Sequence, residues 1–326
     1  MMTGAALFVW LVTAVMLAIT RVGDESVVLV ESLVLFAPLV VVPVGLPLAR
    51  PPVDDAGASP YALARRLWPL GALGAAAGMV VPEGPLAALF VLPWLFVTSL
   101  LASHGLRRLL RGPRTAPELA VSAALLYVPV GAVWLGAYRL GLPLFGFGGV
   151  KALLTASHFH YAGFGACLVA GRVFAGEAGT TSRRRVDASW ARHLHRAATL
   201  GLIAGIALLA AGITASRPLE IAAAWLLVAC VGSIGLLLAL RATEPGVDAV
   251  TRALLAVSAL STVVSMSFAA AFTMTGFAKL EAVTLHRMAT YHGAVNALGF
   301  VACGLFGLAR LDVVTPPRSA PPAPAP

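Results

Sequence analysis

The sequence predicts an all-α fold, a polytopic bundle of about ten transmembrane helices. The first observation is a shortage of charge: of 326 residues, 59% are apolar and 11% are charged, whereas a soluble domain carries about 25% charged residues. The second is a mean hydropathy of +0.90. The third is a succession of apolar stretches of the roughly 20 residues that a bilayer crossing requires. Together these observations exclude a soluble enzyme, a secreted domain and a disordered chain.

Ten apolar stretches meet this length requirement, and short connections join most of them. No basic segment precedes the first stretch, so we expect a retained helix rather than a cleaved signal peptide. The sequence therefore predicts a transmembrane helical domain over 1–312 and a disordered, Pro-rich tail over 313–326. The ten stretches lie near residues 3–20, 27–49, 67–82, 85–103, 117–138, 150–172, 196–214, 219–240, 250–275 and 283–308.

The distribution of Lys and Arg predicts the orientation of this bundle. If the stretches alternate in direction, 17 of the 23 basic residues fall on the side that holds both termini. Cytoplasmic loops carry an excess of Lys and Arg, so we expect a protein of the plasma (inner) membrane with both termini and the tail in the cytoplasm. The net charge of +9 then reports topology, and nucleic acid is not an expected partner.

The lipid bilayer is the expected surrounding, and one polar connection predicts a contact with anionic lipid. The connection 173–195 and the residues after it are rich in basic side chains, which are attracted to anionic headgroups. We expect a solvated juxtamembrane segment there, comprising Arg184, Arg185, Arg192, His193, His195 and Arg196.

Ionisable residues within an apolar stretch mark functional sites by default, because their burial is costly. In the sixth stretch, His158 and His160 lie two residues apart, beside Tyr161. At about 100° per residue they point to nearly opposite faces of a regular helix and would not chelate one metal together. Either they face different neighbours or the helix is broken there, which Gly163 and Gly165 would permit. Interhelical hydrogen bonding and a direct functional role both remain open.

The tenth stretch contains a second polar group. Met288, His292 and Asn296 are spaced by four residues, so they share one helix face. Asn296 suits either an interhelical hydrogen bond or the orientation of His292 or of a ligand. Gly293 and Ala297 form a small-residue pair that would let another helix come close.

The third polar position is Glu31, in the second stretch. It lies about four residues, or roughly 6 Å, inside the stretch, so it is either an interfacial carboxylate or a functional one. Pro38 and Pro43 follow in the same stretch. Proline lacks an N–H group and would kink the helix and free backbone carbonyls there.

These three positions are related by topology. The second, sixth and tenth stretches all begin on the side opposite the termini, so their polar residues lie in the outer half of the membrane. If the three helices are neighbours, they line one polar pocket. The pocket candidates are Glu31, His158, His160, Tyr161, Met288, His292 and Asn296.

The same segments carry a family resemblance. Glu31 with the following Ala-Pro-Leu-Val-Val-Val-Pro run, the segment Ser157–Phe164, and the segment His292–Phe300 resemble those of YndJ-like bacterial membrane proteins. The resemblance implies a polytopic membrane protein. Members are sometimes labelled transporters, with no substrate and no catalytic residues to carry over.

The sequence favours a transporter or small-molecule-binding membrane protein with a His- and Glu-lined pocket open to the outer side. The alternative is a membrane-embedded enzyme, or a redox protein in which His158 or His160 with His292 binds a metal or haem. A structural protein, whose histidines only connect helices, is the third reading. No cofactor is firmly implied, and the small molecule is unidentified.

Overall fold

The computed structural model describes residues 2–21, 25–50, 59–174, 189–278 and 287–314. Within these residues the chain forms ten helical rods and no strand, apart from one isolated bridge between Leu144 and Phe147. The predicted all-α bundle is therefore confirmed. The ten rods coincide with the ten apolar stretches of the sequence.

Several rods change helix type along their length. The second rod comprises α2 (Glu25–Phe36), η1 (Ala37–Val41), α3 (Val42–Gly45) and η2 (Pro47–Ala49), of which η1 is π-helical and η2 is a 3-10 turn. The sixth comprises α7 (Val150–His158), the π-helix η3 (Phe159–Ala166) and α8 (Cys167–Arg172). The tenth comprises the π-helix η5 (Met288–Ala302) and α13 (Cys303–Val314). The others are α1 (Met2–Thr20), α4 (Pro60–Val80), α5 (Pro85–Arg111), α6 (Ala116–Leu140), α9 (Ser189–Ala215), α10 (Arg217–Ala242) and α11 (Ala249–Ala278).

Seven helices of the described residues are long and apolar enough to cross a membrane. They make the chain a multi-pass membrane protein, whereas the expected number of about ten spans stays a prediction. The rods α1, α4 and α7–α8 are not among the seven. Helix α13 reaches Val314, so the first two residues of the predicted tail are helical, and 315–326 lie outside the described residues.

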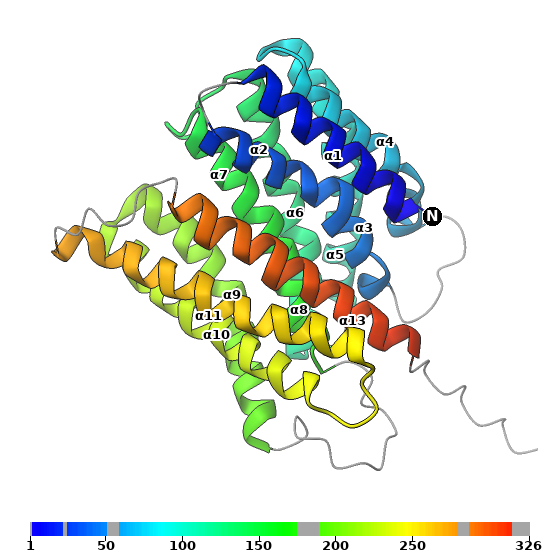
Figure 1. The fold of residues 1–326 in the computed structure, drawn as a ribbon, viewed down its shortest axis with the longest axis vertical. Helices are drawn as coiled ribbons and strands as arrows, with labels where there is room; N and C mark the ends of the chain where they lie inside the picture. The colour runs from blue at the N-terminus through cyan, green and yellow to red at the C-terminus, as the bar shows by residue number, and fades with distance from the viewer. Residues whose placement is uncertain (1, 22–24, 51–58, 175–188, 279–286, 315–326) are drawn as a thin grey trace, which may run out of the picture.

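The rods pack as two flanks with two rods between them (Figure 1). Helices α4, α5 and α6 pack in succession on one flank, together with α1 and α2, and α9, α10 and α11 pack in succession on the other. The rods α7–α8 and η5–α13 lie between the flanks and contact each other through η3 and η5. Helix α2 contacts both α7 and η5, so the second, sixth and tenth rods are neighbours.

Glycines allow α4 to approach α5 closely. A Cβ atom built on Gly74 would lie 2.5 Å from the carbonyl oxygen of Phe90, and one on Gly78 would lie 2.8 Å from that of Ala87. This is the small-xxx-small arrangement by which membrane helices pack without bulky side chains. Any larger residue at these positions would separate the two helices.

The expected distortion at Pro38 is observed, since this residue lies in the π-helix η1. Side chains of neighbouring rods donate hydrogen bonds to backbone carbonyls along the second rod. Trp10 donates to the carbonyl of Ser32 and Trp68 to that of Pro38, each at 2.7 Å. These bonds satisfy carbonyl groups that water cannot reach in a bilayer.

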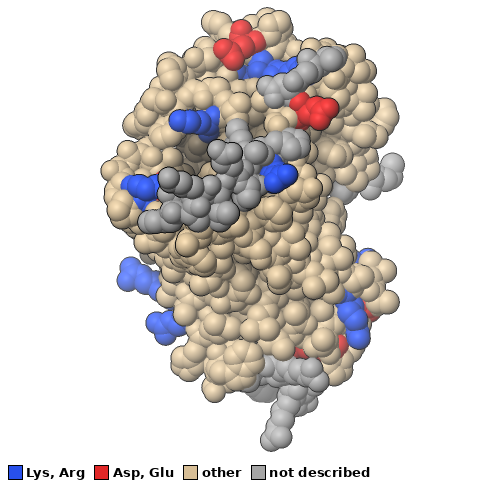
Figure 2. All heavy atoms as spheres, turned by 60° about the vertical axis from the view of Figure 1, so that its left-hand side comes forward, with Lys and Arg blue, Asp and Glu red and all other residues tan. Residues whose placement is uncertain are grey.

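Basic residues gather at one end of the bundle, which we call the basic end. It holds the start of α1 and the end of α13, and therefore both ends of the described chain. Figure 2 turns the opposite end of the bundle toward the viewer. Most of the surface in this view carries neither acidic nor basic side chains, and the charged side chains are scattered. The described residues of the basic end are Arg50, Arg65, Arg66, Arg107, Arg108, Arg111, Arg114, Arg172, Arg192, Arg196, Arg241, Arg252 and Arg310.

Candidate functional site

A cavity of about 270 Å³ lies among α2, α7, η3, α11 and η5. Its walls come from the first halves of the second, sixth and tenth rods and from the far part of α11, so it occupies the half of the bundle away from the basic end. Most of its surface is apolar, and five polar side chains interrupt it. The lining residues are Val30, Leu33, Leu154, Ser157, His158, Tyr161, Ala162, Phe272, Met288, Ala289, His292, Gly293 and Asn296.

Two polar atoms at this cavity are buried and have no hydrogen-bond partner among the residues that the structure describes. They are Nε2 of His158 and Oδ1 of Asn296. The imidazole of His158 packs edge-on against Phe159 at 5.6 Å between ring centroids, a contact that satisfies no hydrogen bond. An unsatisfied buried polar atom costs about 1–3 kcal/mol, so a bound molecule that hydrogen-bonds to these atoms would be stabilised, because it supplies a partner that the described residues do not.

His292 is fixed in one orientation and one tautomer. Its Nδ1 lies 2.9 Å from the carbonyl oxygen of Ser265 on α11. Because a carbonyl oxygen only accepts, Nδ1 carries the proton and Nε2 of the neutral ring keeps its lone pair. This arrangement is typical of histidines that present Nε2 to a ligand.

The hydroxyl groups at the cavity already use their protons. Tyr161 donates to the carbonyl of Leu33 at 2.6 Å, and Ser157 donates to that of Leu153 at 3.1 Å. Only the lone pairs of these oxygens remain available. The hydroxyl oxygens and Nε2 of His292 are therefore acceptors, and the amide of Asn296 adds an acceptor oxygen and an N–H donor group. No Asp, Glu, Lys or Arg is among the lining residues.

Gly293 also lines the cavity, and its expected role differs from its observed one. We predicted that Gly293 and Ala297 admit a close neighbouring helix. A Cβ on Gly293 would meet only the carbonyl oxygen of Met288, at 3.7 Å, so no other helix approaches there. The missing side chain leaves open space instead.

His160 lies outside this cavity and is fully hydrogen-bonded. Its Nδ1 donates to the carbonyl of Ala156 at 2.8 Å, and its Nε2 accepts from the indole N–H of Trp94 at 3.1 Å. Gly131 makes room for the ring, because a Cβ there would lie 2.5 Å from Nδ1. His158 and His160 thus face different neighbours, and the helix also changes to a π-helix between them.

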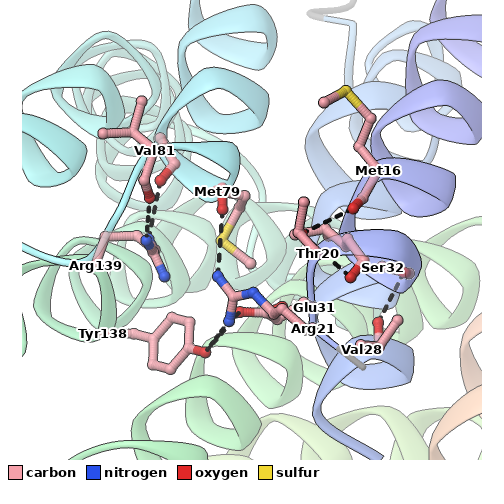
Figure 3. A network of polar contacts seen from close by, with 12 residues as sticks. Met16, Thr20, Arg21, Val28, Glu31, Ser32, Met79, Val81, Tyr138 and Arg139 are labelled. Atoms are coloured by element: carbon pink, nitrogen blue, oxygen red, sulfur yellow. Dashed lines mark hydrogen bonds and ion pairs between the residues drawn. The ribbon is translucent and has the colours of Figure 1, made fainter. Parts of the chain in front are cut away.

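Glu31 lies in a separate polar network between α1, α2 and α6 (Figure 3). Its side chain is 0% exposed, forms an ion pair with Arg21 and accepts a hydrogen bond from Tyr138 at 2.6 Å. The carboxylate is thus enclosed by protein, and its depth in the membrane stays a prediction. It does not line the cavity, although Val30 and Leu33 of the same helix do.

Arginines of this region also cap the end of α4. Arg139 donates from Nε to the carbonyl of Gly78 at 2.9 Å and from Nη2 to that of Val81 at 2.6 Å (Figure 3). Arg21 donates to the carbonyl of Met79 at 3.4 Å. The last carbonyls of a helix lack intrahelical partners and carry partial negative charge, which guanidinium groups satisfy.

Three residues of this network are not among the predicted site residues. Arg21 and Arg139 were assigned only to connections between stretches, and Tyr138 to the end of one. These partners depend on which helices are neighbours, which the sequence does not show.

His195 is not part of a solvated segment, contrary to expectation. It is 4% exposed, its Nε2 lies 2.7 Å from the carbonyl of Ala170, and its ring packs at 4.5 Å from that of Phe174. It therefore connects α9 to α8. His193 is exposed as predicted, and Arg184 and Arg185 lie outside the described residues.

The described residues hold no group of three or more His, Cys, Asp or Glu that could bind a metal ion. His158 and His292 share the cavity, while His160 is bonded to Trp94. The three histidines named as metal candidates are therefore not brought together.

Comparisons with known proteins agree with a membrane protein. Residues 32–300 match the family model described as YndJ-like protein. A relative from Bacillus subtilis (strain 168), described as uncharacterized membrane protein YndJ, is 28% identical over 243 residues, which cover 74% of this chain and 41% of the relative. The match thus spans less than half of that protein's length. No solved structure matches the chain.

Proposed function

We propose that this chain, a multi-pass membrane protein that belongs to the YndJ-like protein family, binds a small, largely apolar molecule bearing a hydrogen-bond donor. The binding site is the cavity among α2, α7, η3, α11 and η5. One observation carries the proposal: the unpartnered Nε2 of His158 and Oδ1 of Asn296 lie at the same cavity as His292, whose Nε2 is an acceptor.

The chemistry of the lining favours an uncharged alcohol over an acid or a protonated amine, because neither ion would meet a side chain of opposite charge there. Leu154, Phe272 and Met288 supply apolar and polarisable surface, and the hydroxyl oxygens and Nε2 of His292 are acceptors. An anion would meet no positive side chain among the lining residues, and burying an uncompensated charge is costly. The volume of about 270 Å³ is close to the lower end of ligand pockets, about 300 Å³, so the ligand is small.

The position of the cavity supports uptake from outside the cell. With the basic end in the cytoplasm, as the positive-inside rule requires, the cavity lies in the outer half of the membrane. We propose transport of the ligand as the biological role, and binding is its first step.

The first experiment compares three probes of nearly equal size: cyclohexanol, cyclohexylamine and cyclohexanecarboxylate. The purified protein in detergent is heated with each probe, and the midpoint of thermal unfolding is recorded. Ligands that bind the folded state raise this midpoint. The alcohol is expected to raise it at millimolar concentration, whereas the carboxylate and the amine, which is protonated at neutral pH, are expected to leave it unchanged. Equal stabilisation by the carboxylate would contradict the proposal.

A cavity-filling variant locates the effect. Gly293→Leu places a side chain in the open space beside Met288 and is expected to abolish stabilisation by cyclohexanol. Gly232→Leu on α10 is the matched control, since a Cβ at Gly232 has no other atom within 4 Å. If Gly293→Leu responds to cyclohexanol like the control, the probe binds elsewhere and the cavity is not the site.

A further inference from the structure

A second concavity lies on the outer surface of the bundle, between α4 and α5. This groove has a volume of about 600 Å³, and all its lining residues are apolar. Leu70, Leu92 and Phe96 at its rim are 63%, 53% and 53% exposed. Its floor is low because Gly71 and Pro93, which face each other there, lack long side chains.

Two arginines lie on the groove side of the same helices, toward the basic end. Arg66 precedes Leu70 by four residues on α4, and Arg107 follows Phe96 by eleven residues on α5. At 3.6 residues per turn both spacings return to nearly the same helix face. Both arginines are exposed, and among the described residues neither forms an ion pair.

Both arginines lie between the groove and the basic end, at different distances from it: Arg66 directly precedes Leu67 of the lining, and Arg107 lies ten residues, or about 15 Å, beyond Val97. Gly71 of α4 packs against Pro93 and Val97 of α5, and the ring centroids of Tyr61 and His104 lie 5.2 Å apart. These contacts show that the two helices run antiparallel, so Arg66 and Arg107 both lie toward the basic end from the groove. The lining from Val97 to Leu89 covers eight residues of α5, or about 12 Å at 1.5 Å per residue. Half of a bilayer's hydrocarbon core is about 15 Å thick.

We propose that this groove binds one anionic phospholipid from the leaflet at the basic end. An acyl chain lies in the groove against Gly71 and Pro93. The phosphate lies between Arg66 and Arg107, whose planar guanidinium groups donate paired hydrogen bonds to phosphate oxygens. This site is distinct from the cavity between α2, η3 and η5 and does not depend on its ligand.

The experiment measures lipid selectivity of the full chain. The protein is extracted from vesicles of equal parts dioleoylphosphatidylglycerol and dioleoylphosphatidylcholine, and bound lipid is counted by native mass spectrometry. We expect several-fold enrichment of phosphatidylglycerol in the wild type. Arg66→Gln with Arg107→Gln should reduce the ratio toward one.

The control carries the same change of charge at the same end of the bundle. Arg65→Gln with Arg252→Gln removes two exposed arginines that lie off the groove face, and it should retain the enrichment. An equal loss of enrichment in both double variants would show a diffuse electrostatic effect and overturn the proposal. Unchanged enrichment in both double variants would also overturn it. Unchanged thermal midpoints establish that the variants are folded.

Competitors with and without an acyl chain test whether binding requires the whole lipid or only its phosphate headgroup. Lysophosphatidylglycerol should displace the bound phosphatidylglycerol, whereas glycerol 1-phosphate and inorganic phosphate should not at the same concentration. Displacement by either soluble phosphate to the same extent would mean that the groove contributes nothing. Efficient cross-linking of Leu70→Cys between two chains in vesicles would instead assign the groove to a second copy.

Discussion

The indole N–H of Trp94 on α5 donates a hydrogen bond to Nε2 of His160 on η3, across 3.1 Å. The two rings are nearly parallel, with an interplanar angle of 16° and centroids 6.0 Å apart, as expected for a hydrogen bond made in the ring planes. Because Nε2 accepts from Trp94 while Nδ1 donates to the carbonyl of Ala156, the imidazole is neutral. His160 therefore connects two helical rods, and other residues line the cavity.

This contact should appear as a coupling between the two positions. Trp94→Phe leaves Nε2 of His160 without a partner, and His160→Leu leaves the indole N–H without one. Each is expected to lower the free energy of unfolding by about 1–3 kcal/mol. The double variant should lose less than the sum, with a coupling of about 0.5–3 kcal/mol. Unfolding in mixed micelles measures all four proteins, and strict additivity would contradict the bond.

Arg21 and Glu31 should also be coupled energetically, and more strongly than Trp94 and His160. Arg21→Met removes the positive partner of the buried Glu31 carboxylate and keeps its hydrogen bond from Tyr138. Removing one partner of a buried ion pair lowers the stability of a protein by about 3–5 kcal/mol. Replacing both residues, by Met and Leu, should be less harmful than Arg21→Met alone. The thermal midpoints of the single and double variants test this order. A double variant less stable than Arg21→Met would refute it.

The two π-helices are in tight contact at Gly165 of η3. A Cβ built there would lie 2.3 Å from Cγ1 of Val301 on η5. Gly165→Ala should therefore destabilise the protein by about 1–3 kcal/mol through overpacking. Val301→Ala in the same chain should restore most of the loss, because it removes the methyl group that clashes. Unfolding of the two variants measures the rescue, and an unrelieved loss would place the strain elsewhere.

Asp248 at the start of α11 should make stability depend on acid pH. Oδ1 accepts from the backbone N–H groups of Val250 and Thr251, each at 3.1 Å. Hydrogen bonds from the Thr251 hydroxyl and backbone, with the nearby Arg310, lower the pKa of this carboxyl from 3.8 to about 2. The folded pKa lies below the unfolded one, so the stabilisation is complete above about pH 5 and is lost as the pH falls toward 2.

Asp248→Asn provides the comparison, because it keeps the size of the side chain and removes its charge. The difference in thermal midpoint between the wild type and this variant should be constant from about pH 5 to 7 and shrink below pH 4. A difference that stays the same down to pH 2 would mean that the carboxylate charge contributes nothing to stability.

The sequence predicted the two polar rods of the cavity better than the cavity itself. The spacing of Met288, His292 and Asn296 predicted a shared face, and all three line the cavity. The angular separation of His158 and His160 predicted different neighbours, and only His158 reaches the cavity. Glu31 was grouped with these residues by its depth, yet depth along a helix says nothing about which side of that helix faces which neighbour.

The sequence by itself determined the class of this protein and the position of its helices. The scarcity of charge, the apolar stretches and the prolines or glycines beside them are local properties of the sequence. They predict where helices form, because a backbone in a bilayer must satisfy its own hydrogen bonds. Only the tertiary structure decided the partners: Trp94 for His160, Arg21 for Glu31, and Ser265 for His292. Those choices depend on which helices become neighbours and on π-helical segments that rotate side chains away from regular helix phase. Packing between distant segments sets both.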